Sequence, residues 1–582
     1  MRAQQTADGL TLRVIAGTYN VLLAMDLTEE KRKGCLGFTI ERTDLDTGQR
    51  RWLPNMLRFA KDPDEKNTTT ARAPLQKFRW GDYTIEPGKR YRYRVIARNE
   101  SIDNIISAGK DAEAGHFDKI PGGVSVEIKA EDNHSNATAI FFNRGAAASE
   151  AYVRKFGDTD PSKLPEPKRT EAFAWLSRGL EEALKAFIGL ATDSTFAIHA
   201  AIYEFQKPEL LEQLKLAKGR GVDVKVVYHG RAKPTPKNKK PEDNPDKTAQ
   251  KNKQAIAAAG IGDLVKPRQA DPQGAIMHNK FVVLLHKGTP VAVWTGSTNW
   301  TEGAIYGQLN VGHAIYDEKV AAKYDAYFAL LLADKGARDM KTGTAGLTPV
   351  PSKPDAIANG VTPIFSPQSS VGMIDLYAAI CAKAKVLLVS APFALHPTIM
   401  KVLKSSPQGA IRFMMADKEG SFGAKGEMDL MQREPGNEAA VATVLKKPLN
   451  DFQGHLLEHT ESFHHAGVHV HSKIIAADPF GPDPIVVTGS ANFSSNSTVE
   501  NDSNSLIIRG DTAVTDIYAT DFMRMFEHYW FRAHQAQVTP NSKDKSKDEV
   551  MSLKEDSSWT DPYYKQGTSE MLDRLAFVQA AK

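Results

Sequence analysis

Apolar and polar positions alternate over the first hundred residues in the way that β-strands require. Leu10–Leu27, Cys35–Asp44 and Tyr83–Asn99 carry β-branched or aromatic residues, and turn residues separate them. Strands at this spacing predict an antiparallel β-sandwich over residues 1–110. We expect this module to bind or brace the rest of the chain, and we assign it no chemistry.

Strands and helices alternate after residue 120. The pattern predicts a strand, a helix and a strand at Thr195–Phe205, Pro208–Lys218 and Val222–His229. A βαβ unit of this kind predicts parallel strands covered by helices. Further upstream we expect two strands, Val124–Lys129 and Thr138–Phe142.

The same unit returns at Lys385–Leu395, Pro397–Ser405 and Ala410–Asp417. We therefore predict an internal duplication. The expected fold is α/β, with two fused pseudo-twofold halves at residues 120–345 and 360–537, each a mixed sheet with flanking helices, after the N-terminal antiparallel β-sandwich. The sandwich is similar in strand spacing to fibronectin type III and immunoglobulin-like modules. Lys335–Pro367 is the expected linker between the halves, and the tail at 538–582 is expected to pack back through Trp559.

The composition is that of an ordinary globular protein, with 41% hydrophobic and 25% charged residues, and this excludes fibrous and disordered classes. No apolar run reaches the roughly 18 residues of a membrane-spanning helix. The start, MRAQQTADGL, lacks the apolar core of a signal peptide, and the two cysteines suit a reducing compartment, so we expect a cytoplasmic protein. A net charge of +4 is too small to indicate nucleic acid by itself.

Two tetrapeptides of the form Gly-Ser-x-Asn each follow a His-x-Lys tripeptide at the same distance. The His-to-Gly spacing is 18 residues in both copies, and the copies are 193 residues apart throughout. Such paired repetition is far beyond chance. The copies are His278-Asn279-Lys280 with Gly296-Ser297-Thr298-Asn299, and His471-Ser472-Lys473 with Gly489-Ser490-Ala491-Asn492.

The motif residues suit the binding of a tetrahedral oxyanion. Each His-x-Lys opens an apolar run, and on a strand the histidine and lysine share one face. Strand, turn and strand then bring the serine and asparagine beside them. A lysine charge, amide and hydroxyl donors and one histidine from each half form a positive pocket that fits a phosphodiester.

At these residues the chain resembles the phospholipase D superfamily, whose signature is His-x-Lys, an aspartate five residues after the lysine, and Gly-Ser-x-Asn. The second copy matches in full, with Asp478 at the aspartate position, whereas the first has Leu285 there. The resemblance covers residues 190 to 535. Asp478 precedes Pro479, so shaping a turn is an alternative role for it.

The resemblance implies a two-step reaction at the junction of the halves, without a metal or other cofactor. One histidine attacks phosphorus and forms a covalent phosphohistidine, and the other protonates the leaving oxygen and then activates water. By this analogy His278 is the nucleophile and His471 the acid and base, although the missing aspartate in the first copy leaves the reverse open. Lys280, Lys473, Asn299 and Asn492 are expected to hold the phosphate oxygens.

The resemblance also implies a partner for the other nitrogen of each histidine, about 25–32 residues downstream. The candidates are Glu302, Gln308 and Asn310 for the first copy and Glu500, Asp502 and Asn504 for the second. Ser297 and Ser490 are expected to contact phosphate, with turn formation as the alternative.

Two other features have simpler interpretations. The lysine-rich segment Lys233–Gln254 is either a solvated loop or a polyanion contact. His464, His465 and His469 lack cysteine or acidic neighbours at metal-ligand spacing, so pocket lining or a loop is preferred to a metal site.

Three functions remain open. The first is a phospholipase D-type enzyme that removes the head group of a glycerophospholipid and makes phosphatidic acid, with possible peripheral contact to a membrane. The second is a metal-independent nuclease acting on DNA or RNA, and the third is a weakly catalytic binding scaffold. Because both motif copies lie in one chain, no oligomer is required to complete the site.

Overall fold

The computed structural model describes the chain except for residues 56, 63–67, 134–136, 146–148, 158, 232–245, 271–274, 406, 424–426, 443–468, 539–551 and 580–582. The lysine-rich residues 233–245, His464 and His465 lie outside the described part. Among the helices in the described part, none combines the length and apolarity needed to cross a bilayer.

The N-terminal region forms two four-stranded antiparallel sheets that share one core. The first has the order β1-β2-β3-β6 and the second β5-β4-β7-β8. Alternate residues of the facing strands, such as Leu12, Leu23, Phe38 and Tyr93, are buried between the sheets. The strands are β1 (Arg2–Ala7), β2 (Leu10–Ala16), β3 (Val21–Leu27), β4 (Phe38–Asp44), β5 (Arg50–Trp52), β6 (Arg79–Asp82), β7 (Arg90–Ala97) and β8 (Val124–Lys129), with α1 (Glu29–Arg32) and α2 (Ile102–Glu113) beside them.

The first half is a seven-stranded mixed sheet of order β12-β11-β10-β13-β14-β15-β9. Strands β10, β11 and β12 run parallel, and the others pair antiparallel. The strands are β9 (Thr138–Phe142), β10 (Phe196–Ile202), β11 (Asp223–His229), β12 (Val265–Arg268), β13 (Lys280–His286), β14 (Thr289–Gly296) and β15 (Val311–Ile315). Helices α3 (Ser149–Phe156), α4 (Lys168–Ser177), α5 (Leu180–Gly189), α6 (Pro208–Gly219) and α7 (Lys247–Ala259) accompany it.

The second half repeats this sheet in the order β16-β22-β21-β20-β17-β18-β19. Each strand therefore has a counterpart at the same place in the first sheet, β20 for β13 and β17 for β10 among them. The strands are β16 (Gly360–Phe365), β17 (Val386–Ala391), β18 (Ile411–Ala416), β19 (Asn437–Val441), β20 (Ile474–Ala477), β21 (Ile485–Gly489) and β22 (Asn504–Arg509). Its helices are α10 (Gly372–Lys383), α11 (Pro397–Leu403), α12 (Glu427–Gln432) and α14 (Ser495–Val499).

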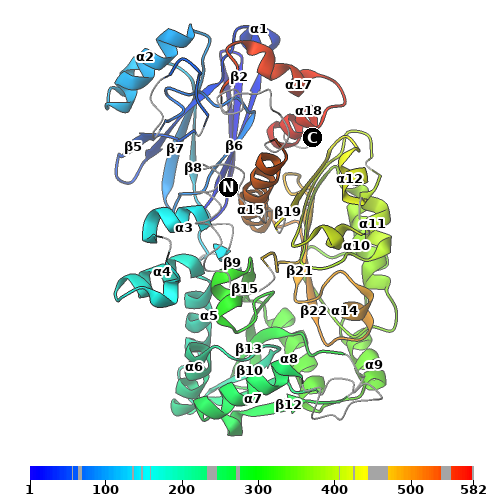
Figure 1. The fold of residues 1–582 in the computed structure, drawn as a ribbon. Helices are drawn as coiled ribbons and strands as arrows, with labels where there is room; N and C mark the ends of the chain where they lie inside the picture. Colours follow the sequence, from blue (N-terminus) through cyan, green and yellow to red (C-terminus); the bar gives the residue numbers. More distant parts are fainter. Residues whose placement is uncertain are drawn as a thin grey trace.

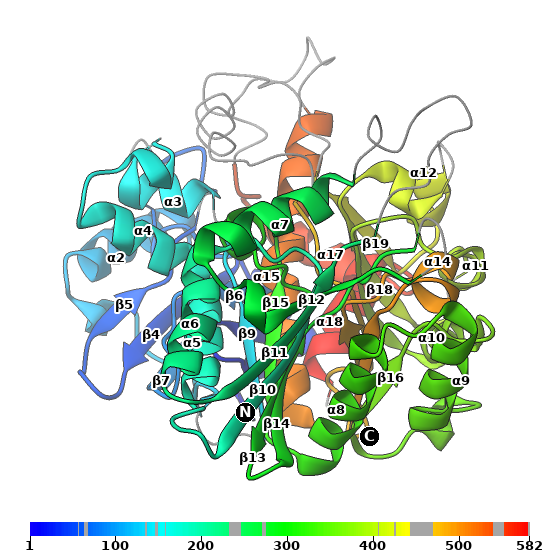
Figure 2. The same cartoon turned by 90° about the horizontal axis from the view of Figure 1, so that it is seen from below.

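A shared core joins the two halves. Helix α8 (Glu318–Leu332) and helix α15 (Thr512–Val538) contribute to it between the sheets. Phe281 and Tyr324 of the first half lie in the same cluster as Ile474 and Phe522 of the second. Figures 1 and 2 show α15 in the middle of the molecule, between the N-terminal sheets and the second half. The predicted α/β class, with two pseudo-equivalent halves after an antiparallel module, is confirmed.

Two details differ from the sequence-based expectation. The strand at Val124–Lys129 forms, but as β8 it pairs with β7, because its alternate valines complete the N-terminal core. The expected linker Lys335–Pro367 contains helix α9 (Ala337–Leu347) and strand β16, and β16 pairs with β22. Its glycines and prolines thus lie between and within regular elements rather than in one long loop.

The end of the chain returns to the N-terminal module, as expected. Helices α17 (Asp561–Tyr564) and α18 (Ser569–Val578) lie beside its sheets in Figure 1, and Trp559 is buried in its core. The indole of Trp559 donates a hydrogen bond to the carbonyl of Cys35, at 2.8 Å. The C-terminal tail is therefore a structural part of the N-terminal module.

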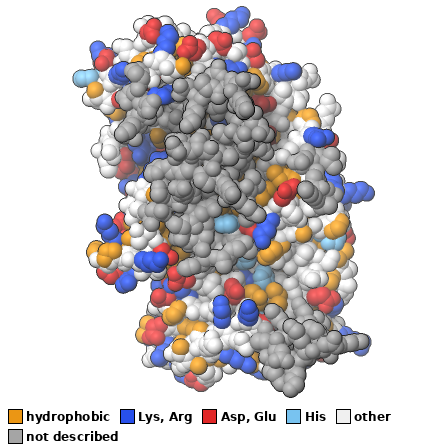
Figure 3. Space-filling view, in the orientation of Figure 1, with side chains coloured by type: hydrophobic (Ala, Val, Ile, Leu, Met, Phe, Trp, Pro, Cys, Tyr) orange, Lys and Arg blue, Asp and Glu red, His pale blue; other side chains and the backbone are white. Residues whose placement is uncertain are grey.

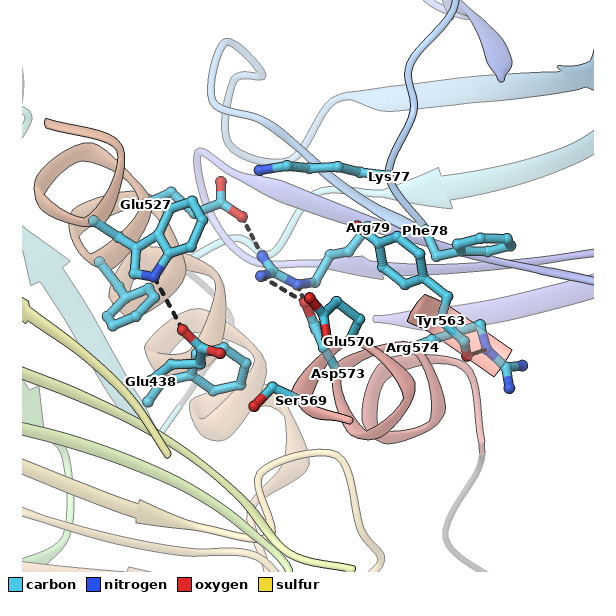
Figure 4. Close-up of a pocket in the computed structure, with 13 residues that line it drawn as sticks. Lys77, Phe78, Arg79, Glu438, Glu527, Tyr563, Ser569, Glu570, Asp573 and Arg574 are labelled. Carbon is cyan, nitrogen blue, oxygen red and sulfur yellow. Dashed lines mark hydrogen bonds and ion pairs between the residues drawn. The ribbon is translucent and has the colours of Figure 1, made fainter. Parts of the chain in front are cut away.

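A cavity of about 180 Å³ lies where this tail, α15, β6 and the second sheet meet (Figure 4). Arg79 crosses it and binds two carboxylates, Asp573 at 2.9 Å and Glu527. The indole of Trp530 donates to Glu438 at 3.0 Å. None of the motif residues lines this cavity. Its charged side chains pair with one another, so it is a polar junction that ties three parts of the chain together.

Candidate active site

The two motif histidines meet at the junction of the halves. Their ring centroids are 6.5 Å apart, and the rings are nearly perpendicular, at 71°. His278 lies two residues before β13 and His471 three residues before β20, so each lies just ahead of a central strand of its sheet. Both side chains are buried, with 4% and 6% of their surface exposed. On the face shown in Figure 3, histidine side chains lie near the middle, with basic side chains beside them.

Each motif lysine folds back along its own strand. Lys280 donates from Nζ to the carbonyl oxygen of His278 at 2.7 Å, and Lys473 donates to that of His471 at 2.6 Å. An ammonium group has three hydrogens, so each lysine keeps donors beyond this bond. The two copies therefore place their lysines in the same way, each beside the histidine of its own copy.

Burial and mutual repulsion shift the pKa values of this cluster downwards. The pKa of His278 is well below its usual value because the ring is buried and because Lys280, Lys473 and His471 surround it. The pKa of His471 falls for the same reasons, with burial the largest cause. Burial also lowers the pKa of both lysines. In a site where protonation is disfavoured in this way, a bound anion stabilises the protonated forms of the histidines and lysines.

Each histidine is held by the backbone of the opposite half. The N–H of His278 donates to the carbonyl of Asp502 at 2.7 Å, and Asp502 donates to Ile276 at 3.1 Å. In the second copy, the N–H of His471 donates to Leu309 at 3.1 Å, and Leu309 donates to His469 at 2.7 Å.

Leu309 and Asp502 are 193 residues apart, the spacing of the repeat. Two short parallel bridges, Met277 with Asp502 and Leu309 with Val470, thus cross the junction. Each half therefore supplies main-chain hydrogen bonds to the histidine of the other half.

The side-chain partner of His471 also comes from the other half. Nδ1 of His471 lies 2.9 Å from Oδ1 of Asn310. Asn310 was one of three candidates for the histidine of its own copy, His278, and the structure instead places it beside the histidine of the other copy. Asn310 lies at the end of the bridging segment, directly after Leu309, and this places it beside the opposite histidine. An amide oxygen accepts only, so it fixes the proton of His471 on Nδ1 and leaves a lone pair on Nε2.

The counterpart of Asn310 in the repeat is Ser503. Its hydroxyl is buried and has no hydrogen-bond partner among the described residues, and the same is true of Nδ1 of His278. Asn504, which we considered for this role, instead contacts Thr295 and Tyr324 through its amide group, at 2.9 and 2.8 Å. The two histidines therefore differ in their support although their motifs agree.

The other expected partners lie elsewhere. Asp502 accepts from two buried arginines of the first half, Arg231 at 2.7 Å and Arg268 at 3.0 Å. Glu302 is exposed at the start of a short helical turn at Gly303–Gly307, and Glu500 lies 3.8 Å from Lys341. The acidic residues were chosen by spacing alone, which carries no information about contacts across the junction.

The two motif serines and Asp478 make hydrogen bonds within their own halves. The hydroxyl of Ser297 donates to Asn310 at 2.8 Å, and that of Ser490 contacts Asn504 at 3.2 Å. Asp478 accepts from the N–H groups of Lys385 and Val386, both at 2.9 Å, at the end of β20 remote from Lys473. The structure therefore does not bring Asp478 to the site, and the turn-shaping alternative describes it.

The glycine of each tetrapeptide is required by close packing of the strands. Gly296 and Gly489 have φ angles of +151° and +133°. A Cβ atom on Gly296 would lie 2.2 Å from the carbonyl oxygen of Val311, and one on Gly489 would lie 2.4 Å from that of Asn504. These contacts exclude any side chain and bring the turn against the next strand, which sets the position of the asparagine.

Asn299 is joined by a carboxylate that sequence reasoning missed. Nδ2 of Asn299 donates to Oε2 of Glu204 at 2.6 Å. Glu204 follows β10 by two residues, at the carboxyl end of a parallel strand, where α/β sheets place their ligand-binding residues. A polar residue directly after a predicted parallel strand is the sequence signal that could have identified Glu204. Its neighbour Tyr203 has its ring 5.1 Å from that of His278.

His469 contacts an aspartate rather than a metal-ligand set. Its N–H donates to Asp417 at 2.5 Å, and its ring nitrogen Nδ1 is 3.6 Å from the same oxygen. Within the described residues, no three His, Cys, Asp or Glu side chains are grouped so that they could hold a metal ion.

Comparison with known proteins agrees with the motif. Residues 185–332 match the family model described as cardiolipin synthase, PLD-like domain. The predicted resemblance to the phospholipase D superfamily is therefore confirmed, and residues 185–332 match its PLD-like domain. No curated protein matches the chain in sequence.

Solved structures with a similar arrangement include three bacterial proteins. Polyphosphate kinase from Porphyromonas gingivalis is 11% identical, with a TM-score of 0.35, over 65% of this chain and 52% of its own, so the chain spans about half of that protein. Phosphatidylserine synthase from Haemophilus influenzae is 12% identical, with a TM-score of 0.37, over 68% and 90%. The phospholipase D family member Nuc from Salmonella typhimurium is 23% identical, with a TM-score of 0.21, over 26% and 87%.

Proposed function

We propose that the protein is a phosphodiesterase that acts through a covalent phosphohistidine and hydrolyses a glycerophospholipid to phosphatidic acid and the free head-group alcohol. The observation that carries the proposal is the pair of buried histidines, 6.5 Å apart between ring centroids, each with a motif lysine beside it. A tetrahedral phosphorus fits between the rings, and the lysines and asparagines stabilise the charge that develops on its oxygens.

His471 is the better nucleophile of the two. Asn310 fixes its proton on Nδ1, so Nε2 carries a lone pair that is free to attack. In the first step the bond between Nε2 and phosphorus forms, the bond between phosphorus and the alcohol oxygen breaks, and that oxygen takes a proton from His278, which enters the step as the imidazolium that the bound phosphate stabilises and leaves it neutral. In the second step His278 takes a proton from water, the water oxygen bonds to phosphorus, and the bond to Nε2 breaks. This reverses the roles expected by analogy.

The roles are separable with a substrate whose leaving group needs no acid, such as a p-nitrophenyl phosphodiester. His278→Ala should release one equivalent of nitrophenol in a burst and accumulate phosphoenzyme, because the acid is dispensable and the base is missing. His471→Ala should give neither. Phosphoenzyme formed by the His471→Ala variant would contradict this assignment and show that His278 is the nucleophile. The exposed His116 provides a matched control, His116→Ala.

The substrate class is tested with wild type and both variants in EDTA, each given phospholipid vesicles and, separately, single-stranded and duplex DNA. Phosphatidic acid formed by wild type and lost in both variants supports the proposal. DNA cleavage that is lost in the same variants would make the protein a nuclease instead. Equal results for wild type and variants on both substrates would favour the binding scaffold.

A further inference from the structure

Two strands at equivalent places in the two sheets end in different polar residues. Strand β11 lies beside β10 in the first sheet, and β18 lies beside β17 in the second. His229 is the last residue of β11, and Asp417 directly follows the last residue of β18. Both side chains are buried, with 1% of their surface exposed. They lie at the carboxyl ends of parallel strands, where α/β sheets place functional side chains.

Both side chains accept a hydrogen bond from the main chain directly before a motif histidine. Nδ1 of His229 accepts from the N–H of Met277 at 3.3 Å. Oδ1 of Asp417 accepts from the N–H of Val470 at 3.2 Å and from that of His469 at 2.5 Å. Met277 and Val470 are 193 residues apart, the spacing of the repeat. The two contacts are therefore equivalent in the duplication, although one acceptor is an imidazole and the other a carboxylate.

These acceptors hold the second side of the segment that carries each histidine. Met277 forms the parallel bridge with Asp502 of the opposite half, and its neighbours Ile276 and His278 make the hydrogen bonds of that bridge. The N–H of Met277 points to the other side, where His229 accepts it. One side of the segment is thus held by the opposite half and the other by its own sheet. The second copy repeats this arrangement.

The ring of His229 acts on His278 through the main chain. Because Nδ1 accepts from Met277, the ring proton of His229 lies on Nε2, and this nitrogen is 3.7 Å from a carboxylate oxygen of Asp246. The ring of Tyr203 is 5.1 Å from the ring of His229 and 5.1 Å from that of His278. Both nitrogens of His229 are therefore directed at groups other than the reacting histidine, which suits a role in orientation.

We propose that His229 and Asp417 are positioning residues, each of which fixes the direction of the motif histidine in its own half by accepting the N–H of the residue before it. Loss of the acceptor leaves a buried N–H without a partner and lets the histidine turn away from phosphorus. The inference rests on the proposed function and assigns each acceptor to one step. His229 supports the histidine that activates water, and Asp417 supports the histidine that attacks phosphorus.

The two steps are measured separately on the p-nitrophenyl phosphodiester. With enzyme in excess, nitrophenol release reports the first step, and the decay of phosphoenzyme after removal of substrate reports the second. His229→Leu should slow the decay about tenfold and leave nitrophenol release near the wild-type rate, because this leaving group needs no acid. Asp417→Leu should slow nitrophenol release about tenfold. A misfolded fraction lowers the amplitudes and leaves these rates unchanged.

Conservative variants separate the acceptor from the shape of the side chain. His229→Asn and Asp417→Asn each place an amide oxygen on Cγ, where it accepts the same N–H, and each should restore most of the lost rate. His199→Leu is the matched control, since His199 is a half-buried histidine of β10 whose Nδ1 is 2.6 Å from Asp325. It should change neither step. Asparagine variants that restore nothing, or a His229→Leu variant slowed equally in both steps, would overturn the inference.

Hydrogen exchange of the Met277 amide, followed by mass spectrometry, tests the contact without a substrate. His229→Leu should make this amide exchange about tenfold faster, and His229→Asn and His199→Leu should keep it slow. Exchange that His229→Leu leaves unchanged would overturn the inference whatever the activity. If wild type forms no phosphoenzyme while the exchange rates follow this order, the proposed function fails and the role of His229 in holding the segment stands.

Discussion

Oδ1 of Asn310 lies 2.9 Å from Nδ1 of His471, although 161 residues separate them in the chain. The amide belongs to one half of the duplication and the histidine to the other. Substitution of Asn310, which belongs to the first half, should therefore impair the second motif copy, that of His471. The equivalent residue, Ser503, makes no such contact among the described residues and provides an internal comparison.

Asn310→Ala should lower kcat by about 10- to 100-fold, because His471 would lose the group that fixes its tautomer and orientation. KM should change little, since Asn310 lies behind the ring. Steady-state kinetics on the p-nitrophenyl diester measures both. Ser503→Ala is the control and should retain activity. Equal losses in the two variants would contradict the asymmetry between the histidines.

Anion binding should draw protons into the site. The pKa values of His278, His471, Lys280 and Lys473 are all lowered, with burial the first cause in each case. A bound phosphate favours the protonated forms and raises these pKa values again. Calorimetric titration with inorganic phosphate in two buffers of different ionisation heat should report net proton uptake. Identical heats in both buffers would show that no uptake occurs.

Stability should rise with pH through the range in which free histidine titrates. The folded pKa of His278 and His471 lies below the unfolded value of about 6.5, so near and below that pH the unfolded chain binds more protons than the folded chain. The free energy of unfolding therefore falls as pH drops from 7.5 to 5.5. Urea unfolding at both pH values measures it. The double variant His278→Gln, His471→Gln should show a shallower dependence, and an unchanged slope would assign the effect to other groups.

Asp502 should be more important for stability than for chemistry. Its carboxylate is buried and binds Arg231 and Arg268, so Asp502→Ala leaves the buried Arg231 without that carboxylate and Arg268 with Asp334 alone. We expect a loss of about 3 kcal/mol in the free energy of unfolding. Glu500→Ala, two residues away and partly exposed, is the control and should unfold near the wild-type urea concentration. A loss as large in the control would show that the effect comes from the loop and not from the ion pairs.

Arg79 should be a second stabilising centre, remote from the site. Arg79→Met leaves Glu527 and Asp573 facing one another across the junction in Figure 4. These carboxylates are less than a third exposed, and we expect a loss of about 2 kcal/mol. The exposed pair Arg90 and Asp46 offers a matched control, Arg90→Met, which should have little effect. Retained phosphodiesterase activity at low temperature would separate this stabilising role from catalysis.

The sequence predicted the duplicated fold and the residues that form its two motif copies, because strand periodicity and exact repetition can be read from the sequence alone. It could not predict which half supports each histidine. The contacts of Asn310 with His471 and of Asp502 with Arg268 depend on the packing of one sheet against the other. Glu204 was missed for a related reason, since a single glutamate after a strand carries no repeat.

The packing of Trp559 against Cys35 bears on how the protein is made. The N-terminus of a chain leaves the ribosome first. The strands of the two N-terminal sheets therefore emerge long before Trp559, whose indole fills their core. Until then the N-terminal module leaves an apolar surface uncovered, around Phe38 and Phe78, which Trp559 later contacts. The module made first is thus among the last to be completed, and C-terminal truncations should expose it to proteases and chaperones.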